Sequence, residues 1–307
     1  MTKNTHDFSI AGLLCLFVTY IVWGSTYLAI RVAVREDAGW GPFWLGAMRV
    51  LVAAAVLFAL NALRSVRLKP TRSELGVVVT TGLLLWVGGN GAVNWAEQRI
   101  DSGLAALIVG TMPIWVAVME SLIDRRRPSL LLSTSLLTGF VGLVVLTYPM
   151  IEDGVRSDVL GVVAVIFAAI SWGFGSIVVN RRQPKLDPIA ISGWQQLAGG
   201  AGFVLIALMV AEPAPRPTTE AWAAWGYLVV FGSLLAYTCF VYALKVLPTT
   251  VVMTYAYVNP VIAVLLGWLI LSEPITSYTV AGMVLIVGGV YGVFRDKGRR
   301  QTPNSEV

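Results

Sequence analysis

Ten apolar stretches, each long enough to cross a bilayer as a helix, dominate the sequence. Only 13% of the 307 residues are charged and 57% are apolar, whereas soluble domains carry about 25% charged residues. The stretches do not alternate apolar and polar residues as porin strands do. We therefore expect an all-α integral membrane protein with ten transmembrane helices. Their approximate positions are residues 9–30, 43–61, 75–97, 103–122, 130–149, 158–180, 187–211, 221–244, 248–271 and 276–294.

Lysine and arginine alternate sharply between successive connections. One set of connections carries sixteen of the 22 basic residues: Lys3, Arg64, Arg67, Lys69, Arg72, Arg125, Arg126, Arg127, Arg181, Arg182, Lys185, Lys245, Arg295, Lys297, Arg299 and Arg300. Basic connections stay in the cytoplasm, so both termini are expected there, as an even number of crossings also requires. A multi-pass protein of the cell inner membrane explains the net charge of +5 without a nucleic-acid partner.

The two sets of five stretches carry traces of an internal repeat. A Trp-Gly pair occurs at Trp23 and again at Trp172, 149 residues later. Pro113 and Pro260 are 147 residues apart, and each is followed about fifteen residues later by another proline. Nearly constant offsets indicate a duplication.

An odd number of crossings per copy forces the second copy to cross the membrane in the opposite sense. Residues 1–150 and 151–297 are therefore expected to form two inverted five-helix repeats, followed by a disordered cytoplasmic tail at 298–307. Inverted repeats build solute sites near the middle of the membrane and expose them alternately to either side. The architecture favours a small-molecule transporter.

Several motifs, taken in order, carry a resemblance to a known family. They are Trp23-Gly24-Ser25, the segment from Phe43 to Arg49, the helices of Pro113 and Pro260, and Leu271-Ser272-Glu273-Pro274. Over essentially its whole length the chain resembles the drug/metabolite transporter superfamily, specifically its EamA-type ten-helix exporters. Among these it is most similar to the YddG-type exporters of aromatic amino acids. The resemblance implies a central cavity and outward movement of amino acids or related metabolites.

Polar and aromatic side chains inside the stretches are candidates for lining such a cavity, because burying them in hydrocarbon is costly. Flat aromatic walls with a few amides suit a solute that is partly apolar and partly zwitterionic. Packing within the bundle is the competing explanation for each of them. The expected substrate-binding residues are Tyr20, Trp23, Tyr27, Arg49, Trp86, Asn90, Asn94, Trp172, Tyr237, Tyr255 and Asn259.

Two of these candidates have specific structural alternatives. Asn259 either binds solute or satisfies a carbonyl freed by Pro260, whose ring removes one helical hydrogen bond. Arg49 either receives a carboxylate or plays a structural role, by snorkelling outward or pairing with Glu97 or a helix carbonyl. We favour the structural role for Arg49. No acidic residue lies near the middle of a predicted span, since Glu97 lies toward the outer end of the third and Glu120 toward the inner end of the fourth. This favours uniport over proton coupling.

Proline and glycine suggest where the bundle bends and packs. Pro113 and Pro260 occupy matching helices and are candidate hinges, with static bends as the alternative. Gly288 and Gly292 form a G-x-x-x-G pattern that is typical of close helix packing. We favour packing within the chain, so a monomer is expected and a dimer remains the alternative.

Other function classes lack their sequence signatures. No phosphate-binding loop, H-E-x-x-H, G-x-S-x-G or pair of membrane aspartates occurs in the sequence. We therefore expect no enzyme, no cofactor and no metal site. The leading hypothesis is a secondary transporter that exports aromatic or neutral amino acids and related metabolites by alternating access, without an ion gradient. The alternative is a proton-coupled multidrug or metabolite exporter.

Overall fold

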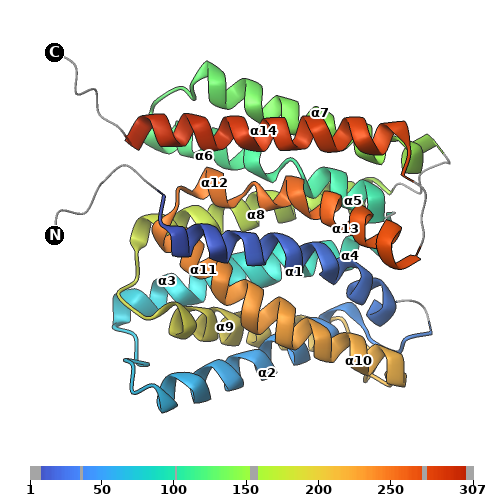
Figure 1. Cartoon of the computed structure of the whole chain (residues 1–307). Coiled ribbons are helices and arrows are strands. Elements are labelled where there is room, and N and C mark those ends of the chain that lie inside the picture. The colour runs from blue at the N-terminus through green and yellow to red at the C-terminus, as the bar shows by residue number, and fades with distance from the viewer. Residues whose placement is uncertain (1–7, 35–36, 101, 153–157, 272–274, 302–307) are drawn as a thin grey trace.

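The structure is a computed structural model that describes residues 8–34, 37–100, 102–152, 158–271 and 275–301. Within these ranges the chain folds into a bundle of helices that lie side by side (Figure 1). Among the described residues, nine helices are long and apolar enough to cross a membrane, and α1 adds a shorter apolar stretch at Ile10–Thr26. The prediction of an all-α membrane protein with ten helices is confirmed.

The ten crossings follow the expected order. Six of them are single helices: α1 (Ile10–Val34), α2 (Pro42–Leu63), α7 (Leu130–Glu152), α8 (Val159–Arg182), α9 (Pro188–Met209) and α14 (Ser277–Gln301). The other four are interrupted: α3–η1–α4 (Arg72–Gly82, Leu83–Gly91, Ala92–Ala96), α5–α6 (Ser102–Val109, Met112–Asp124), α10–η2–α11 (Thr219–Tyr227, Leu228–Ala236, Tyr237–Val246) and α12–α13 (Thr249–Val252, Tyr255–Leu271).

Local sequence signals explain where several helices begin. At the start of α3, Thr71 accepts a hydrogen bond from the Glu74 backbone N–H, and the Glu74 carboxylate accepts one from the Thr71 N–H. This capping box satisfies two amides that the first helical turn leaves free. Asp187 caps α9 through the Ile189 N–H at 2.9 Å. The polar connections thus fix the helix ends on which the apolar crossings depend.

The two halves pack with a shared pattern. α2 lies against α9, and α7 lies against α14, so each pair joins crossings of the same rank (Figure 1). α1 packs against α11 and α13, just as α8 packs against η1 and α6. Five crossings separate the start of α1 from that of α8, so these two helices run in opposite directions. The packing is therefore that of an inverted repeat.

The end of the chain differs from the prediction. α14 continues through Gln301, so residues 298–301 are helical and do not belong to a disordered tail. Lysine, arginine and glutamine are good helix formers and extend the helix beyond the apolar span. Residues 302–307 lie outside the described part of the chain, as do Ser272, Glu273 and Pro274 of the motif noted above.

Two nine-residue π-helices, η1 and η2, interrupt the third and eighth crossings at matching places. Their widened turns leave carbonyl groups that accept bonds from the other half of the chain. Ser171 Oγ donates to Leu84 O at 2.8 Å, and Trp23 Nε1 donates to Gly232 O at 3.2 Å. Such π-helical turns are rare and are frequent at functional sites.

The two candidate hinges lie in different settings. Pro113 stands in the first turn of α6, directly after the break at Gly110–Thr111 that separates α5 from α6. The missing N–H of proline costs nothing at that position. Pro260 lies inside α13, whose break from α12 comes earlier, at Met253–Thr254. Hinge movement at either proline stays a prediction.

Helices α7 and α14 approach closely along a line of glycines. A methyl group on Gly289 would lie 2.5 Å from the Gly139 backbone nitrogen, and one on Gly282 would lie 2.8 Å from the Gly142 carbonyl oxygen. Gly292 faces Ser135, whereas Gly288 has open space around it. The close contact lies within the chain. Gly289 makes it rather than Gly288, because Gly289 lies on the face of α14 that is turned toward α7.

Candidate functional site

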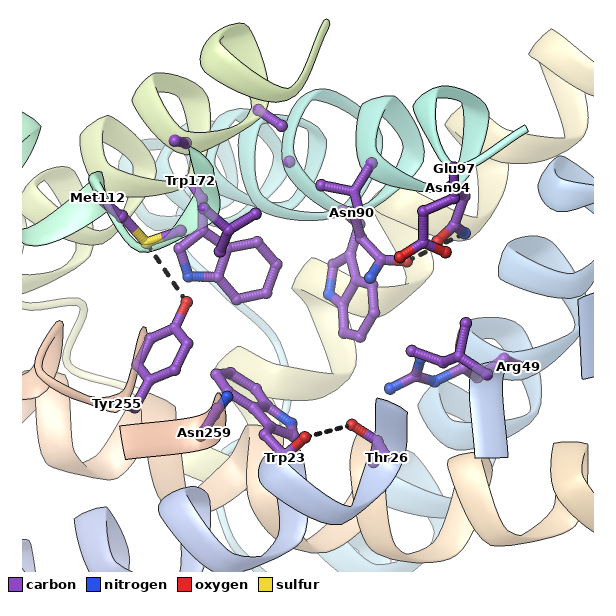
Figure 2. A pocket seen from close by; sticks show the side chains of 17 residues that line it. Trp23, Thr26, Arg49, Asn90, Asn94, Glu97, Met112, Trp172, Tyr255 and Asn259 are labelled. Carbon is purple, nitrogen blue, oxygen red and sulfur yellow. Dashed lines mark hydrogen bonds between the residues drawn. The ribbon is translucent and has the colours of Figure 1, made fainter. Parts of the chain in front are cut away.

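A cavity of about 120 Å³ lies among the crossings (Figure 2). Helices of both halves build it: α1, α2, η1–α4 and α5–α6 from the first, α8 and α13 from the second. The side chains that line it are Trp23, Thr26, Ile30, Arg49, Trp86, Gly89, Asn90, Val93, Asn94, Glu97, Val109, Met112, Ala168, Ala169, Trp172, Tyr255 and Asn259.

Most of the side chains expected from sequence to contact solute meet at this cavity. The eight that line it are Trp23, Arg49, Trp86, Asn90, Asn94, Trp172, Tyr255 and Asn259. Tyr20 and Tyr237 are not among the lining residues. The side chain of Tyr27 lies outside the described part of the structure.

Four aromatic rings form one side of the cavity and hold each other in place. Trp23 lies edge-on to Trp172, with 5.7 Å between ring centroids, and edge-on to Tyr255 at 4.9 Å. Trp86 meets Trp172 at 6.2 Å and 72°. Tyr255 also donates a hydrogen bond to Met112 Sδ at 3.4 Å (Figure 2). Edge-to-face pairs of this kind are favourable, so the rings of the wall stabilise one another's positions.

Tyr20 and Tyr237 form a layer behind this wall. The Tyr237 hydroxyl donates to Gln195 Oε1 at 2.9 Å, and its ring packs on Trp86 with 4.8 Å between centroids. The Tyr20 hydroxyl shares a hydrogen bond with Thr254 Oγ1. Both hydroxyls have partners within the protein, and neither tyrosine lines the cavity. Contact of these two tyrosines with solute stays a prediction.

Polar side chains gather at the other end of the cavity, where Arg49, Asn94 and Glu97 approach one another (Figure 2). Arg49 is only 7% exposed, and its Nε donates to Ser233 Oγ at 2.7 Å. Its guanidinium also lies 5.5 Å from the centroid of the Trp86 ring. The guanidinium therefore turns inward and does not snorkel, and no ion pair with Glu97 is found in the described residues.

The amides are held more loosely than the aromatic rings. Asn94 Nδ2 is 3.4 Å from both Asn90 Oδ1 and the carbonyl oxygen of Pro42, at the long end of the hydrogen-bond range. Asn259 is 2% exposed, and its Oδ1 atom has no hydrogen-bond partner within the described residues. A buried amide oxygen of this kind is costly unless something else satisfies it. Within the described residues, Asn94 and Asn259 therefore bring weakly bonded or unsatisfied amide atoms to the cavity.

Sequence reasoning missed several lining residues. Glu97 follows Asn90 by seven positions and Asn94 by three, so the helical period alone places it on the same face. Thr26 follows Trp23 by one turn and donates to the Trp23 carbonyl oxygen at 2.7 Å. Other lining residues such as Ala168 carry no chemical signal, and only the packing of the helices reveals them.

Ionic contacts join the two halves at the end of the bundle that carries most of the basic residues. Glu120 of α6 accepts a hydrogen bond from Thr250 Oγ1 at 2.7 Å and lies 3.5 Å from Lys297 Nζ of α14. Asp124 pairs with Arg181 of α8 at 2.8 Å. The cavity instead extends along η1–α4 toward Glu97, at the less basic end. Ion pairs between the halves are therefore found at the basic end, and Arg99 and Asp158 form a further one, at 3.6 Å, at the less basic end.

Comparison with known proteins identifies the family. The profile of the EamA-like transporter family matches residues 10–148 and 159–295, which correspond to α1–α7 and α8–α14. The uncharacterized inner membrane transporter YedA of Escherichia coli (strain K12) is 33% identical over 254 residues, which are 82% of this chain and 80% of that protein. The uncharacterized transporter YoaV of Bacillus subtilis (strain 168) is 25% identical over 275 residues, 88% of this chain and 92% of its own.

A protein of known crystal structure shares the fold, with a TM-score of 0.79 at 20% sequence identity. The likeness covers 95% of this chain and 99% of the other. The family match spans both halves and covers most of the sequence. The resemblance to EamA-type transporters is confirmed, and the chain belongs to the EamA-like transporter family.

Proposed function

We propose that this protein is a secondary transporter that exports aromatic and other neutral amino acids, with related metabolites, through the cavity described above. The observation that carries the proposal is the division of one small cavity into two ends. Trp23, Trp172 and Tyr255 form an aromatic end, and Arg49 with Asn94 stands at a polar end (Figure 2). An amino acid with an apolar side chain has the same division.

The size of the cavity supports a small solute. Its volume of about 120 Å³ is below the roughly 300–1,000 Å³ of sites for drug-sized ligands. The aromatic rings of the wall can pack against a flat apolar group of the solute. The same features support the narrower likeness to YddG-type exporters of aromatic amino acids.

Alternating access would follow from the inverted packing. The ionic contacts at the basic end hold the halves together there, and their release would open the cavity to that side. We place this side in the cytoplasm, with both termini, because basic connections remain there. Rocking about Pro113 and Pro260 is part of this proposal. We place the protein in the inner membrane, as the name of the relative YedA states for that protein.

The driving force is the gradient of the solute itself in this proposal, since the apolar spans carry no acid at mid-height. Glu97, however, lines the polar end of the cavity, and a carboxylate on a solute path can carry protons. That position favours a proton-coupled multidrug or metabolite exporter as the second candidate. A test of function must therefore include an imposed pH gradient.

Flux measurements with purified protein in liposomes distinguish these candidates. We expect labelled tryptophan and phenylalanine to move down their own gradients at the same rate with and without a pH gradient, and a quaternary amine not to move. Threonine reports on neutral amino acids without a ring. Movement of the amine alone, or movement that requires a pH gradient, would overturn facilitative amino-acid export and support the second candidate.

Variants of the aromatic end connect the flux to the cavity. Trp23→Ala should lower tryptophan flux about tenfold or more, because it removes a ring that contacts two other wall residues. Asn90→Ala should also impair flux. Trp268→Ala is the matched control, since Trp268 is 50% exposed and does not line the cavity. Normal flux in both cavity variants, at normal expression, would contradict the site.

A further inference from the structure

The Arg49 guanidinium is a buried cation with spare donors. Its Nε donates to Ser233, and its Nη2 lies so close to Gly232 that a methyl group there would be 2.7 Å away. No acceptor for either terminal nitrogen is found among the residues that the structure describes. A buried charge is costly without a counter-charge. The guanidinium faces the cavity (Figure 2), so a ligand there can supply one.

The Glu97 carboxylate is the opposite case in the same cavity. It ends the third crossing directly after α4 and lines the polar end beside Asn94 (Figure 2). Across the described ranges, no hydrogen bond or ion pair reaches its oxygen atoms. Carboxylates accept strong bonds from ammonium groups. Within the described part of the chain, the cavity thus presents one carboxylate and one guanidinium that lack an ionic partner.

Arg49 and Glu97 do not form a direct ion pair with each other within the described structure. An Arg–Glu pair would place nitrogen and oxygen within 4.0 Å, and none of the pairs found in the described chain joins these residues. The amides of Asn90 and Asn94 stand beside them, and the aromatic wall lies toward the other end (Figure 2). The space between the charges is therefore left for a solute that carries both a cationic and an anionic group.

We propose that Glu97 and Arg49 are the specificity-determining pair of this site, with Glu97 receiving the α-ammonium group and Arg49 the α-carboxylate of a zwitterionic solute. This inference rests on the proposed function and sharpens its substrate class. A solute with both groups satisfies both protein charges at once. A solute that lacks one group leaves a desolvated protein charge unpaired, which is the strongest way for a site to reject a near-isostere.

Recognition by the charge pair selects a different set of solutes from recognition by the aromatic wall alone. The wall accepts any flat apolar group of suitable size, including amines and acids. The charge pair restricts the solute to zwitterions, whatever the side chain. It also explains why Glu97, at a helix end, faces the cavity without a hydrogen-bond or ionic partner among the described residues.

Competition binding with three isosteric probes tests the assignment. Labelled tryptophan is bound to the protein at pH 7, and three unlabelled competitors are added in turn. They are tryptophan, indole-3-propionate, which lacks the ammonium group, and tryptamine, which lacks the carboxylate. We expect the wild-type protein to bind tryptophan at least about tenfold more tightly than either analogue, which is the effect of one charged hydrogen bond. Equal affinity for all three in the wild-type protein would overturn the inference.

Two variants, each of which removes one charge, should affect the affinities for the two analogues differently. Glu97→Gln should lower the affinity for tryptophan and tryptamine about tenfold and leave that for indole-3-propionate unchanged. Arg49→Gln should lower the affinity for tryptophan and indole-3-propionate and leave that for tryptamine unchanged. Asp158→Asn is the control, because Asp158 is exposed at the same end of the bundle and does not line the cavity.

The outcomes separate this inference from the proposed function. Unchanged tryptophan affinity in Glu97→Gln, with wild-type binding intact, overturns the role of Glu97 and leaves amino-acid export standing. If the wild-type flux responds to a pH gradient, and Glu97→Gln abolishes this response but keeps its affinity for tryptophan, Glu97 carries protons rather than binding ammonium groups. Absence of tryptophan binding in the wild-type protein overturns the proposed function together with the inference.

Discussion

The contact between α7 and α14 yields a prediction from two adjacent glycines. A methyl group at position 289 would lie 2.5 Å from Gly139 N, 2.7 Å from Gly139 Cα and 2.7 Å from the carbonyl oxygen of Ser135. All three are backbone atoms, so the helices must move apart. At position 288 the same methyl group meets nothing within 4 Å. Gly289→Ala and Gly288→Ala therefore differ only in this overlap.

The magnitude follows from two terms. Alanine gains about 1 kcal/mol over glycine in a helix interior, and this gain is common to both variants. Overpacking a tight contact costs about 1–3 kcal/mol, and only Gly289→Ala incurs it. The free energy of unfolding should therefore be about 1–3 kcal/mol lower in Gly289→Ala than in Gly288→Ala. Thermal unfolding of purified protein in one detergent measures the difference, and equal stability of the two variants would refute the contact.

Three further predictions concern the layer behind the cavity, the ion pair at the basic end of the bundle and the orientation of the protein in the membrane. Tyr237→Phe should lower the free energy of unfolding by about 1–3 kcal/mol, because the buried Gln195 oxygen loses its donor. Tyr242→Phe is the control. An equal loss of stability in both variants would contradict a stabilising role for the hydrogen bond between Tyr237 and Gln195. Lys297→Met should lower the free energy of unfolding by about 1–3 kcal/mol in the same assay, because the half-buried Glu120 loses its counter-charge. Equal stability of Lys297→Met and Lys297→Arg would argue against a stabilising ion pair between Lys297 and Glu120. Reporter fusions at each terminus should be active only in the cytoplasm, and periplasmic activity at either end would refute the orientation.

The sequence predicted the crossings well because their signal is strong and local. Twenty apolar residues in a row have few other solutions than a membrane helix, and short polar connections leave little freedom for their order. The predicted span 187–211, for example, agrees with α9 at Pro188–Met209 to within two residues at each end. The helical tail at 298–301 was missed because a polar helix extension has no apolar period to reveal it.

Cavity-lining positions were most predictable where burial of a polar group is unavoidable, and solute contact at these positions stays a prediction. Asn90, Asn94 and Arg49 cannot face lipid cheaply, and all three line the cavity. Aromatic residues were less predictable, since a tyrosine hydroxyl finds its partner on another helix. Tyr237 bonds to Gln195, 42 positions away, and no pattern within α11 announces that contact.

The π-helices mark the limit of reasoning from periodicity. η1 and η2 arise where the hydrogen-bond register shifts by one residue, and apolar segments such as Leu83–Gly91 carry no period that reports the shift. Their partners, Ser171 and Trp23, belong to the opposite half of the chain. Only the assembled fold brings these donors to the freed carbonyl groups.

The claim that this cavity is the solute site is tested most directly by protection of a cysteine placed in it. Val93→Cys, in a protein whose free thiols Cys15 and Cys239 are replaced by serine, puts a thiol on the cavity wall; Asp158→Cys places one outside it. A polar thiol reagent is applied to the detergent-solubilised protein with and without tryptophan. At ten times its Kd, tryptophan should slow labelling at position 93 about elevenfold, as simple occupancy requires, and leave position 158 unaffected. Labelling at position 93 that proceeds at the same rate with saturating tryptophan would contradict the account.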